Sequence, residues 1–222
     1  MRKFWGSLLV AVVLMVVSAG ASVITSLPGG TVIPMPAIPC SSPTFACFGP
    51  GPFTFGPGIT WSSTNAFNGG GSVFGYRGGY IFGTNGNWTG ALGPMAGLNS
   101  AADFFGSPDT MTFALSTPAF AIGGFLNYVP GFSTNTTIAV YDSNWNLIEA
   151  PFTLTFTTTG ANDTGAFFGF KESSKVISYF TLTDNYVGIT GLTEVVPEPG
   201  SLLLIGTGLL GVIGYSRRRL GM

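Results

Sequence analysis

The second half of the chain is a series of short apolar segments separated by turn residues, and this pattern constrains the fold more than any other feature. Each segment is about four to nine residues long and rich in β-branched or aromatic side chains, as strands are. No stretch between the two ends of the chain shows sustained helical periodicity. The pattern predicts an all-β fold, an antiparallel β-sandwich of jelly-roll type with eight or nine strands. The expected strands are 111–115, 120–128, 137–141, 146–149, 152–158, 167–171, 176–183 and 186–192.

One of these segments, 152–157, alternates strictly between large apolar residues and threonines. Successive side chains of a strand point to opposite faces, so the alternation predicts Phe152, Leu154 and Phe156 toward the core and Thr153, Thr155 and Thr157 toward solvent. These threonines are the only row in the sequence that resembles an ice-binding plane. One row cannot make a flat array, so the sequence does not favour ice binding.

The region before the strand series is rich in proline and then in glycine. Eight prolines between residues 28 and 57 predict an extended segment at 22–60, ahead of a sandwich domain at 61–195. Aromatic residues then alternate with glycine and asparagine, and short strands are expected near 73–76 and 80–82. The rings admit two interpretations, core filler or a platform on which a sugar stacks. The candidate stacking residues are Trp61, Tyr76, Trp88 and Trp145.

Cys40 and Cys47 are the only cysteines. In an oxidising compartment this short spacing predicts one disulfide that closes a small loop. A metal site is the alternative, and the absence of histidine disfavours it. No metal or other cofactor is predicted.

The N-terminal residues have the order of a secretory signal peptide. A basic start is followed by an apolar run at 4–17 and by small residues at Ala19 and Ala21. We expect residues 1–21 to be removed before Ser22 after export through the Sec pathway. An uncleaved N-terminal anchor is the alternative.

The last residues of the chain, 196–222, have three parts in a fixed order. Val196, Pro197, Glu198 and Pro199 form a stiff extended peptide, and an uncharged Leu/Gly-rich run at 201–215 predicts a short membrane helix. Three arginines follow it, which places the C-terminus in the cytoplasm by the positive-inside rule. They are Arg217, Arg218 and Arg219.

This three-part order resembles the PEP-CTERM sorting signal of bacterial exported proteins. The resemblance implies recognition by an exosortase, a membrane-embedded cysteine protease-transpeptidase that cuts near the Pro-Glu-Pro. It also implies a transient stay in the inner membrane, followed by transfer to the cell surface or extracellular matrix. The same tail occurs on some ice-binding proteins. A plain C-terminal anchor with an accidental Pro-Glu-Pro is the alternative.

The body also resembles that of many proteins with this tail, a β-sandwich similar to carbohydrate-binding modules. The segments that carry the likeness are 121–131, 138–142, 146–149, 168–170 and 180–184. In those proteins the last strand often ends in Ile-Asp-Asp-Leu, whereas 187–192 here lacks the acidic pair.

Charge and residue types exclude several function classes. Between residues 22 and 196 there are eight acidic and three basic residues, so no basic patch is available for nucleic acid. Without histidine, Ser-His-Asp and Cys-His catalysis are impossible within the chain. A glycosidase needs only two carboxylates, yet nothing marks a pair among Asp142, Glu149, Asp163 and Asp184. We therefore predict that the protein is not an enzyme.

Two function classes remain open. The favoured one is a structural or adhesive surface protein associated with exopolysaccharide, as in a biofilm. The alternative is a specific carbohydrate-binding or ice-binding module. The segment 142–146 has the Asp-x-Asn-x-Asn start of a calcium loop but lacks its glycine and terminal glutamate, so a simple Asx turn is preferred.

Overall fold

The computed structural model describes residues 22–39, 49–65, 71–99, 108–132 and 135–196. The predicted signal peptide, both cysteines, the sorting tail after Val196 and its membrane helix lie outside these ranges. Within them, no helix combines the length and the apolar character needed to cross a membrane.

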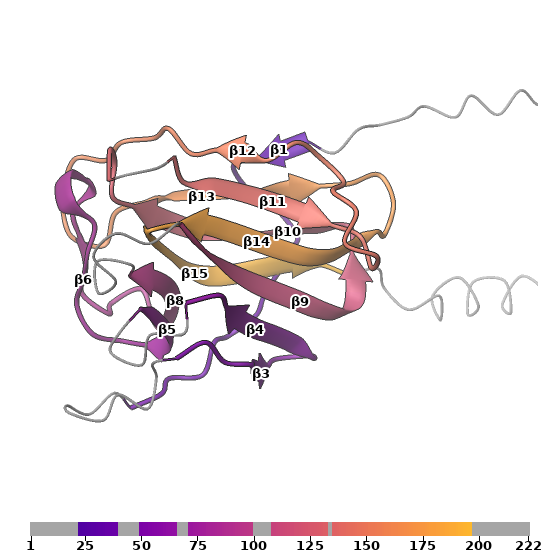
Figure 1. The fold of residues 1–222 in the computed structure, drawn as a ribbon, viewed down its shortest axis with the longest axis horizontal. Coiled ribbons are helices and arrows are strands. Elements are labelled where there is room, and N and C mark those ends of the chain that lie inside the picture. The colour runs from indigo at the N-terminus through magenta and orange to yellow at the C-terminus, as the bar shows by residue number, and fades with distance from the viewer. Residues whose placement is uncertain (1–21, 40–48, 66–70, 100–107, 133–134, 197–222) are drawn as a thin grey trace, which may run out of the picture.

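The described chain forms two large antiparallel sheets that pack face to face (Figure 1). The first sheet has, in spatial order, β1 (Ser22–Ile24), β13 (Ala166–Lys171), β10 (Ala121–Tyr128), β15 (Tyr186–Val195), β8 (Met95–Asn99) and β5 (Ser72–Tyr76), and β2 (Thr31–Val32) also pairs with β15. The second has β12 (Phe152–Thr153), β11 (Thr137–Tyr141), β14 (Ile177–Asp184), β9 (Asp109–Ala119), β4 (Ile59–Ser63) and β3 (Phe53–Phe55). The prediction of an all-β antiparallel fold is confirmed, and the jelly-roll type stays a prediction.

A small two-stranded sheet lies beside these layers. It consists of β6 (Tyr80–Ile81) and β7 (Asn87–Trp88), joined through a 3-10 turn at Gly83–Asn85. Glycines suit such a connection because Gly83 and Gly86 both have positive φ, 59° and 85°.

The Pro-rich N-terminal segment is built into the sandwich rather than placed ahead of it. β1 pairs with β13, β2 pairs with β15, and β3 and β4 extend the second sheet. The boundary expected between residues 60 and 61 falls inside β4. Proline limits strands to short edge pieces, and the lengths of two, three and three residues for β2, β1 and β3 agree with that limit.

Two expected strands differ from the structure. The segment 146–149 is a loop with one isolated bridge, between Tyr141 and Leu147. Of the expected strand 152–158 only Phe152 and Thr153 pair with β11, although Leu154 still donates its N–H to Thr136 O at 2.8 Å. The predicted facing is nonetheless confirmed, because Phe152, Leu154 and Phe156 pack on the core while Thr155 and Thr157 are exposed.

The main core lies between the two large sheets. One inward row of the second sheet crosses four strands and is fully buried: Val140, Phe180, Phe113 and Trp61. Residues of the first sheet such as Ile122, Phe170 and Ile189 are also fully buried in this core. Burial of each such side chain contributes about 1.5–3 kcal/mol.

A second aromatic cluster lies under the β6–β7 sheet. Its buried members include Tyr80, Phe82 and Trp88, whose rings contact one another at centroid distances of 5.2 and 4.8 Å. The Trp88 indole N–H donates to Thr164 O at 2.7 Å, which ties the cluster to the loop before β13. We call Tyr80, Phe82 and Trp88 the buried aromatic cluster.

Both ends of the described body lie at one end of the first sheet. The register aligns Ser22 with Lys171, Lys171 with Ala121, and Ala121 with Val195. Three strand spacings separate Ser22 from Val195, a distance of about 14 Å. Figure 1 shows the start of β1 and the end of β15 at the same side of the body.

Candidate binding face

The most unusual surface feature is an exposed aromatic cluster on the second sheet. Trp145 stacks on Tyr179 of β14 with ring centroids 3.9 Å apart and an interplanar angle of 17°. Its ring also lies 5.5 Å from that of Tyr141, the last residue of β11. Trp145 remains 52% exposed, so the indole face that does not cover Tyr179 is available to solvent. We call Tyr141, Trp145 and Tyr179 the exposed aromatic cluster.

A tight loop, 142–146, places the tryptophan over the sheet. The Asp142 carboxylate accepts the backbone N–H groups of Asn144 and Asn146 at 2.8 and 2.9 Å and the Asn146 side-chain amide at 2.9 Å. The Trp145 N–H donates to Asp142 O at 3.1 Å. The side-chain hydrogen bond from Asn146, followed by the backbone bonds, lowers the pKa of Asp142. The predicted Asx turn is confirmed, and it already uses both carboxylate oxygens.

The backbone of Trp145 is strained. Its φ is +62°, in the left-handed region that non-glycine residues rarely occupy. Such a conformation costs about 1–3 kcal/mol, and strained residues often lie at functional sites. The turn hydrogen bonds of 142–146 hold this conformation and keep the tryptophan half-exposed, outside the core.

The same face of the sheet carries three outward rows that cross several strands. They alternate with the buried inward rows, and their residues are aligned by the strand register. The first row is Thr153, Thr137, Thr183 and Thr110; the second is Ala139, Thr181, Thr112 and Ser62; the third is Tyr141, Tyr179, Ala114, Thr60 and Thr54. We call these rows the hydroxyl face. With strand spacing near 4.8 Å they span about 14 by 19 Å.

Hydroxyl pairs link neighbouring strands within these rows. Thr110 and Thr183 hydroxyls lie 2.8 Å apart, and those of Thr54 and Thr60 lie 3.0 Å apart. The structure thus aligns threonines of several strands in rows, which the single segment 153–157 could not do. These rows run across strands rather than along one, which corrects the expectation that Thr153, Thr155 and Thr157 form the only threonine row.

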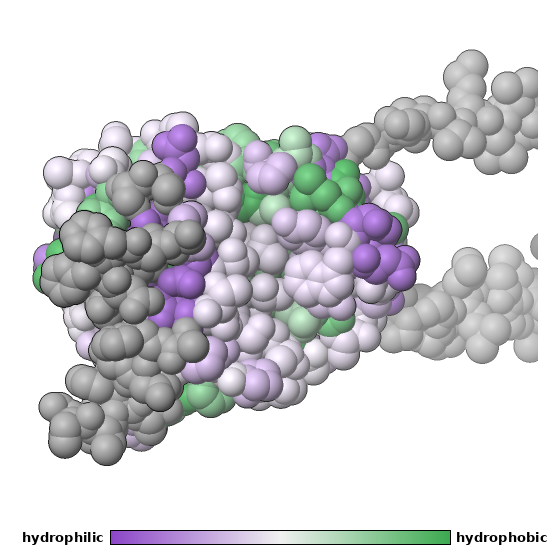
Figure 2. Space-filling view, viewed as in Figure 1, coloured by the Kyte–Doolittle hydropathy of each residue, from purple (hydrophilic) through white to green (hydrophobic). Residues whose placement is uncertain are grey.

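The hydroxyl face carries no charged side chain in any of its three rows. Figure 2 shows the side of the molecule that the second sheet presents in Figure 1, and its central surface is pale, between the hydrophilic and hydrophobic extremes. Strongly hydrophilic patches lie around this region. The middle row is the least accessible, since Ala139 and Thr181 are buried. A surface of this kind offers hydroxyl groups and small apolar groups to a neutral ligand.

The four candidate stacking residues do not form one platform. Trp61 is 0% exposed in the main core and Trp88 is 2% exposed in the buried aromatic cluster, so neither can stack on a sugar. Of the four, Trp145 alone is exposed. The core-filler interpretation therefore holds for Trp61 and Trp88.

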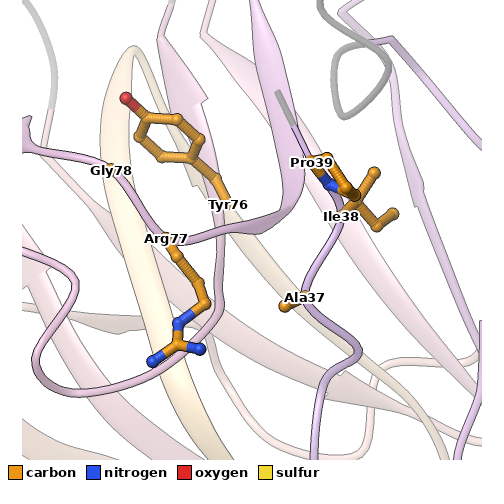
Figure 3. Close-up of a pocket in the computed structure, with 6 residues that line it drawn as sticks. All are labelled: Ala37, Ile38, Pro39, Tyr76, Arg77 and Gly78. Carbon is orange, nitrogen blue, oxygen red and sulfur yellow. The ribbon is translucent and has the colours of Figure 1, made fainter. Parts of the chain in front are cut away.

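Tyr76 is half-buried on the first sheet, apart from the hydroxyl face. It lines a shallow cavity of about 350 Å³ together with Arg77 and with residues 37–39. In Figure 3 the Tyr76 ring and the Arg77 guanidinium point in different directions from the strand. The Tyr76 hydroxyl donates to Gly79 O at 3.4 Å.

Of the four carboxylates considered for catalysis, Asp142, Asp163 and Asp184 accept hydrogen bonds in three separate places. Asp163 accepts the backbone N–H and the hydroxyl of Thr89 at 2.8 and 2.7 Å. Asp184 is 1% exposed and accepts hydrogen bonds from the Thr136 hydroxyl and the Asn185 N–H. Burial raises the pKa of Asp184 to about 6. Within the described ranges, no three or more acidic, cysteine or histidine side chains are grouped to hold a metal ion.

Sequence reasoning missed Tyr141, Tyr179 and the cross-strand threonines. Tyr141, Tyr179 and most of these threonines lie in expected strands, but Thr54, Thr60 and Thr110 do not. Period-two alternation places Tyr141 and Tyr179 on the face opposite to that of Val140 and Phe180. Which outward residues become neighbours depends on strand register, which the sequence does not state.

Comparison with known protein families finds one match, at the C-terminal end. Residues 195–219 match the PEP-CTERM protein-sorting motif. No curated protein and no solved structure matches the chain. The match begins at the last residue of β15, so the sorting segment follows the body directly.

Proposed function

We propose that this chain, which carries a PEP-CTERM protein-sorting motif and is therefore an exported substrate of exosortase, is an adhesive surface protein that binds extracellular polysaccharide through its hydroxyl face. The motif supports export, a transient membrane-anchored state and processing. The binding role rests on the body. The observation that carries it is Trp145, stacked on Tyr179 and held half-exposed by a strained loop.

The chemistry of the face favours a neutral polysaccharide. An aromatic ring stacks on the apolar face of a sugar, while threonine and serine hydroxyls can donate and accept hydrogen bonds with sugar hydroxyls. An acidic polymer would need basic side chains to neutralise its charge, and the hydroxyl face has none. The ligand we propose is a flat, uncharged glycan that contacts the exposed aromatic cluster and extends across the strands. The proposal is of a binding protein, not an enzyme.

The decisive experiment is co-sedimentation of the exported protein with insoluble neutral polysaccharides, with alginate gel as the acidic comparison. We expect binding to a neutral polymer and loss of at least about fivefold in affinity for Trp145→Ala, since an aromatic stack contributes about 1–3 kcal/mol. Trp145→Phe should retain part of the affinity. The matched control is Phe132→Ala, which removes another exposed ring, 43% accessible and packed against Tyr186 of the first sheet, away from the hydroxyl face. Equal binding by Trp145→Ala and the parent protein would refute the proposed site.

The threonine rows favour one second candidate, binding to ice. An array of hydroxyl and methyl groups at regular spacing over four strands is the specific observation that supports it. Ice-affinity partitioning distinguishes the two. Incorporation into ice that is abolished by Thr112→Lys at the centre of the face, with no glycan binding in the parent protein, would favour ice over polysaccharide.

A further inference from the structure

A small cavity lies at the end of the sandwich from which the sorting segment leaves. It has a volume of about 110 Å³, the space of roughly three to four water molecules. Its apolar lining includes Ile59 of β4 and Leu115 of β9, both in the main core. Ser116, Thr117 and Val196 also line it, and these three are exposed residues at its opening.

Glu194 contributes the one charged side chain among the described residues that line this cavity. In the register, Glu194 pairs with Ile122, which is fully buried between the sheets, so the glutamate also points inward. It is only 4% exposed. Within the described part of the chain, no donor gives its carboxylate a hydrogen bond or an ion pair.

A buried carboxylate without a donor is costly for a folded protein. Burial raises the pKa of Glu194, because the loss of solvent disfavours the charged form of its carboxyl group. Such a group calls for an explanation, and a cation or donor from outside the chain would supply one. A metal ion would need several oxygen ligands, and besides Glu194 the side chains of the lining offer only the hydroxyls of Ser116 and Thr117.

An alkylammonium group fits the remaining features. Apolar walls of Ile59 and Leu115 suit a short methylene stem, and the carboxylate of Glu194 suits the positive head. The Ser116 hydroxyl donates to Pro57 O at 3.3 Å, which leaves its lone pairs available to accept from the head. The volume matches the terminal methylenes and ammonium of a lysine side chain.

We propose that this cavity binds a primary alkylammonium group, such as the end of a lysine side chain presented by another chain, through Glu194. The site is independent of the hydroxyl face, since it lies between the sheets at their edge. It adjoins Val196, so the partner would dock beside the point where the body meets the Pro-Glu-Pro peptide.

The test is ligand-observed NMR titration of the exported protein with n-butylammonium chloride at constant ionic strength, with n-butanol as the uncharged analogue. We expect saturable binding of n-butylammonium, no binding of n-butanol, and affinity at least about tenfold weaker in Glu194→Gln. Glu149→Gln removes another carboxylate outside the cavity lining and should leave the affinity unchanged.

Several results would overturn the proposal. They are the absence of saturable binding, equal binding of n-butanol, an unchanged affinity in Glu194→Gln, or displacement by calcium ions at equal ionic strength. If Glu194→Gln fails to fold, Val196→Phe provides the second variant, because a bulky ring at the opening should block entry without touching the carboxylate. Unaltered binding in Val196→Phe would then count against the cavity as the site.

Discussion

The buried and the exposed aromatic clusters both combine tryptophan with tyrosine but occupy opposite environments. Trp88 packs between strands and a loop, and its indole N–H has a backbone acceptor. Trp145 covers one tyrosine and presents its other face to solvent. Both follow asparagine in polar, turn-rich sequence. Residue type alone therefore does not separate a core ring from a binding ring; the backbone around it does.

The largest expected effect is on stability, from truncation within the buried cluster. Trp88→Ala should lower the free energy of unfolding by about 3–5 kcal/mol, because it leaves a cavity and an unpaired carbonyl at Thr164. Trp145→Ala should cost only about 1 kcal/mol, the worth of one exposed stack. Chemical denaturation of the two variants measures the contrast. Equal losses would mean that Trp145 is a structural residue.

The second effect concerns pH. The pKa of Asp142, beside the exposed cluster, is lowered, whereas the pKa of Asp184, near the buried cluster, is raised. Burial raises the pKa of Tyr80 in the buried cluster, and the charge of Asp184 adds to that rise. Burial also raises the pKa of Asp184 itself from 3.8 to about 6. The folded state then holds this proton more tightly than the unfolded state. Its contribution, about 3 kcal/mol, is fully present below pH 4 and lost as pH rises to about 6.

Thermal melts between pH 4 and pH 7 measure this dependence. The melting temperature should fall with rising pH, and Asp184→Asn should make the curve flatter. Burial also raises the pKa values of Glu172 and Glu194, so a smaller slope of the same sign should persist in the variant. A melting temperature that rises across this window in the parent protein, and does so equally in the variant, would contradict the assignment.

A third contrast sharpens the comparison within one segment. Phe156 packs on Tyr128 and Phe168 with centroids 5.1 and 5.5 Å away, whereas the preceding residue, Thr155, is exposed. Phe156→Asp should cost about 2–4 kcal/mol, since it removes packing and adds an unpaired charge. Thr155→Asp should stay within about 0.5 kcal/mol. If Thr155→Asp unfolded the protein first, the assigned facing would be inverted.

The smallest effect is spectroscopic and needs no change in stability. Iodide should quench the fluorescence of Trp145 and leave Trp61 and Trp88 largely unaffected, because only the first is reachable by an ion. Trp145→Phe should remove the quenchable fraction, and a bound glycan should protect it. The measurement should use protein without the signal peptide, because that peptide contains Trp5. Quenching that persists in the Trp145→Phe variant of this protein would show that a second indole is accessible.

The strands with clear alternation or β-branched content were predictable from the sequence. β9, β10, β11, β13, β14 and β15 all overlap the expected ranges. The segment after Thr153 shows why the rest was not. Alternation fixes which side chains are buried, but a strand also needs a partner, and after Leu154 the chain no longer pairs with β11.

The candidate site was less predictable than the fold, for two physical reasons. The hydroxyl face depends on register, which aligns Thr137 with Thr183 and Thr183 with Thr110 although these residues are far apart in sequence. The exposed cluster depends on a positive φ at Trp145 that the turn imposes. The Asp-Ser-Asn-Trp-Asn sequence predicts the turn, but not where its tryptophan points.

The position of β15 has a mechanical consequence for a protein tethered at its C-terminal side. β15 pairs with β10 along one edge and with β8 and β2 along the other, and the chain leaves it in line through Val195. Tension applied there while a ligand restrains the opposite sheet would act along the strand, perpendicular to its hydrogen bonds. Many bonds would then resist together in shear instead of opening one after another. The chain therefore leaves the body through a strand that is paired along both of its edges.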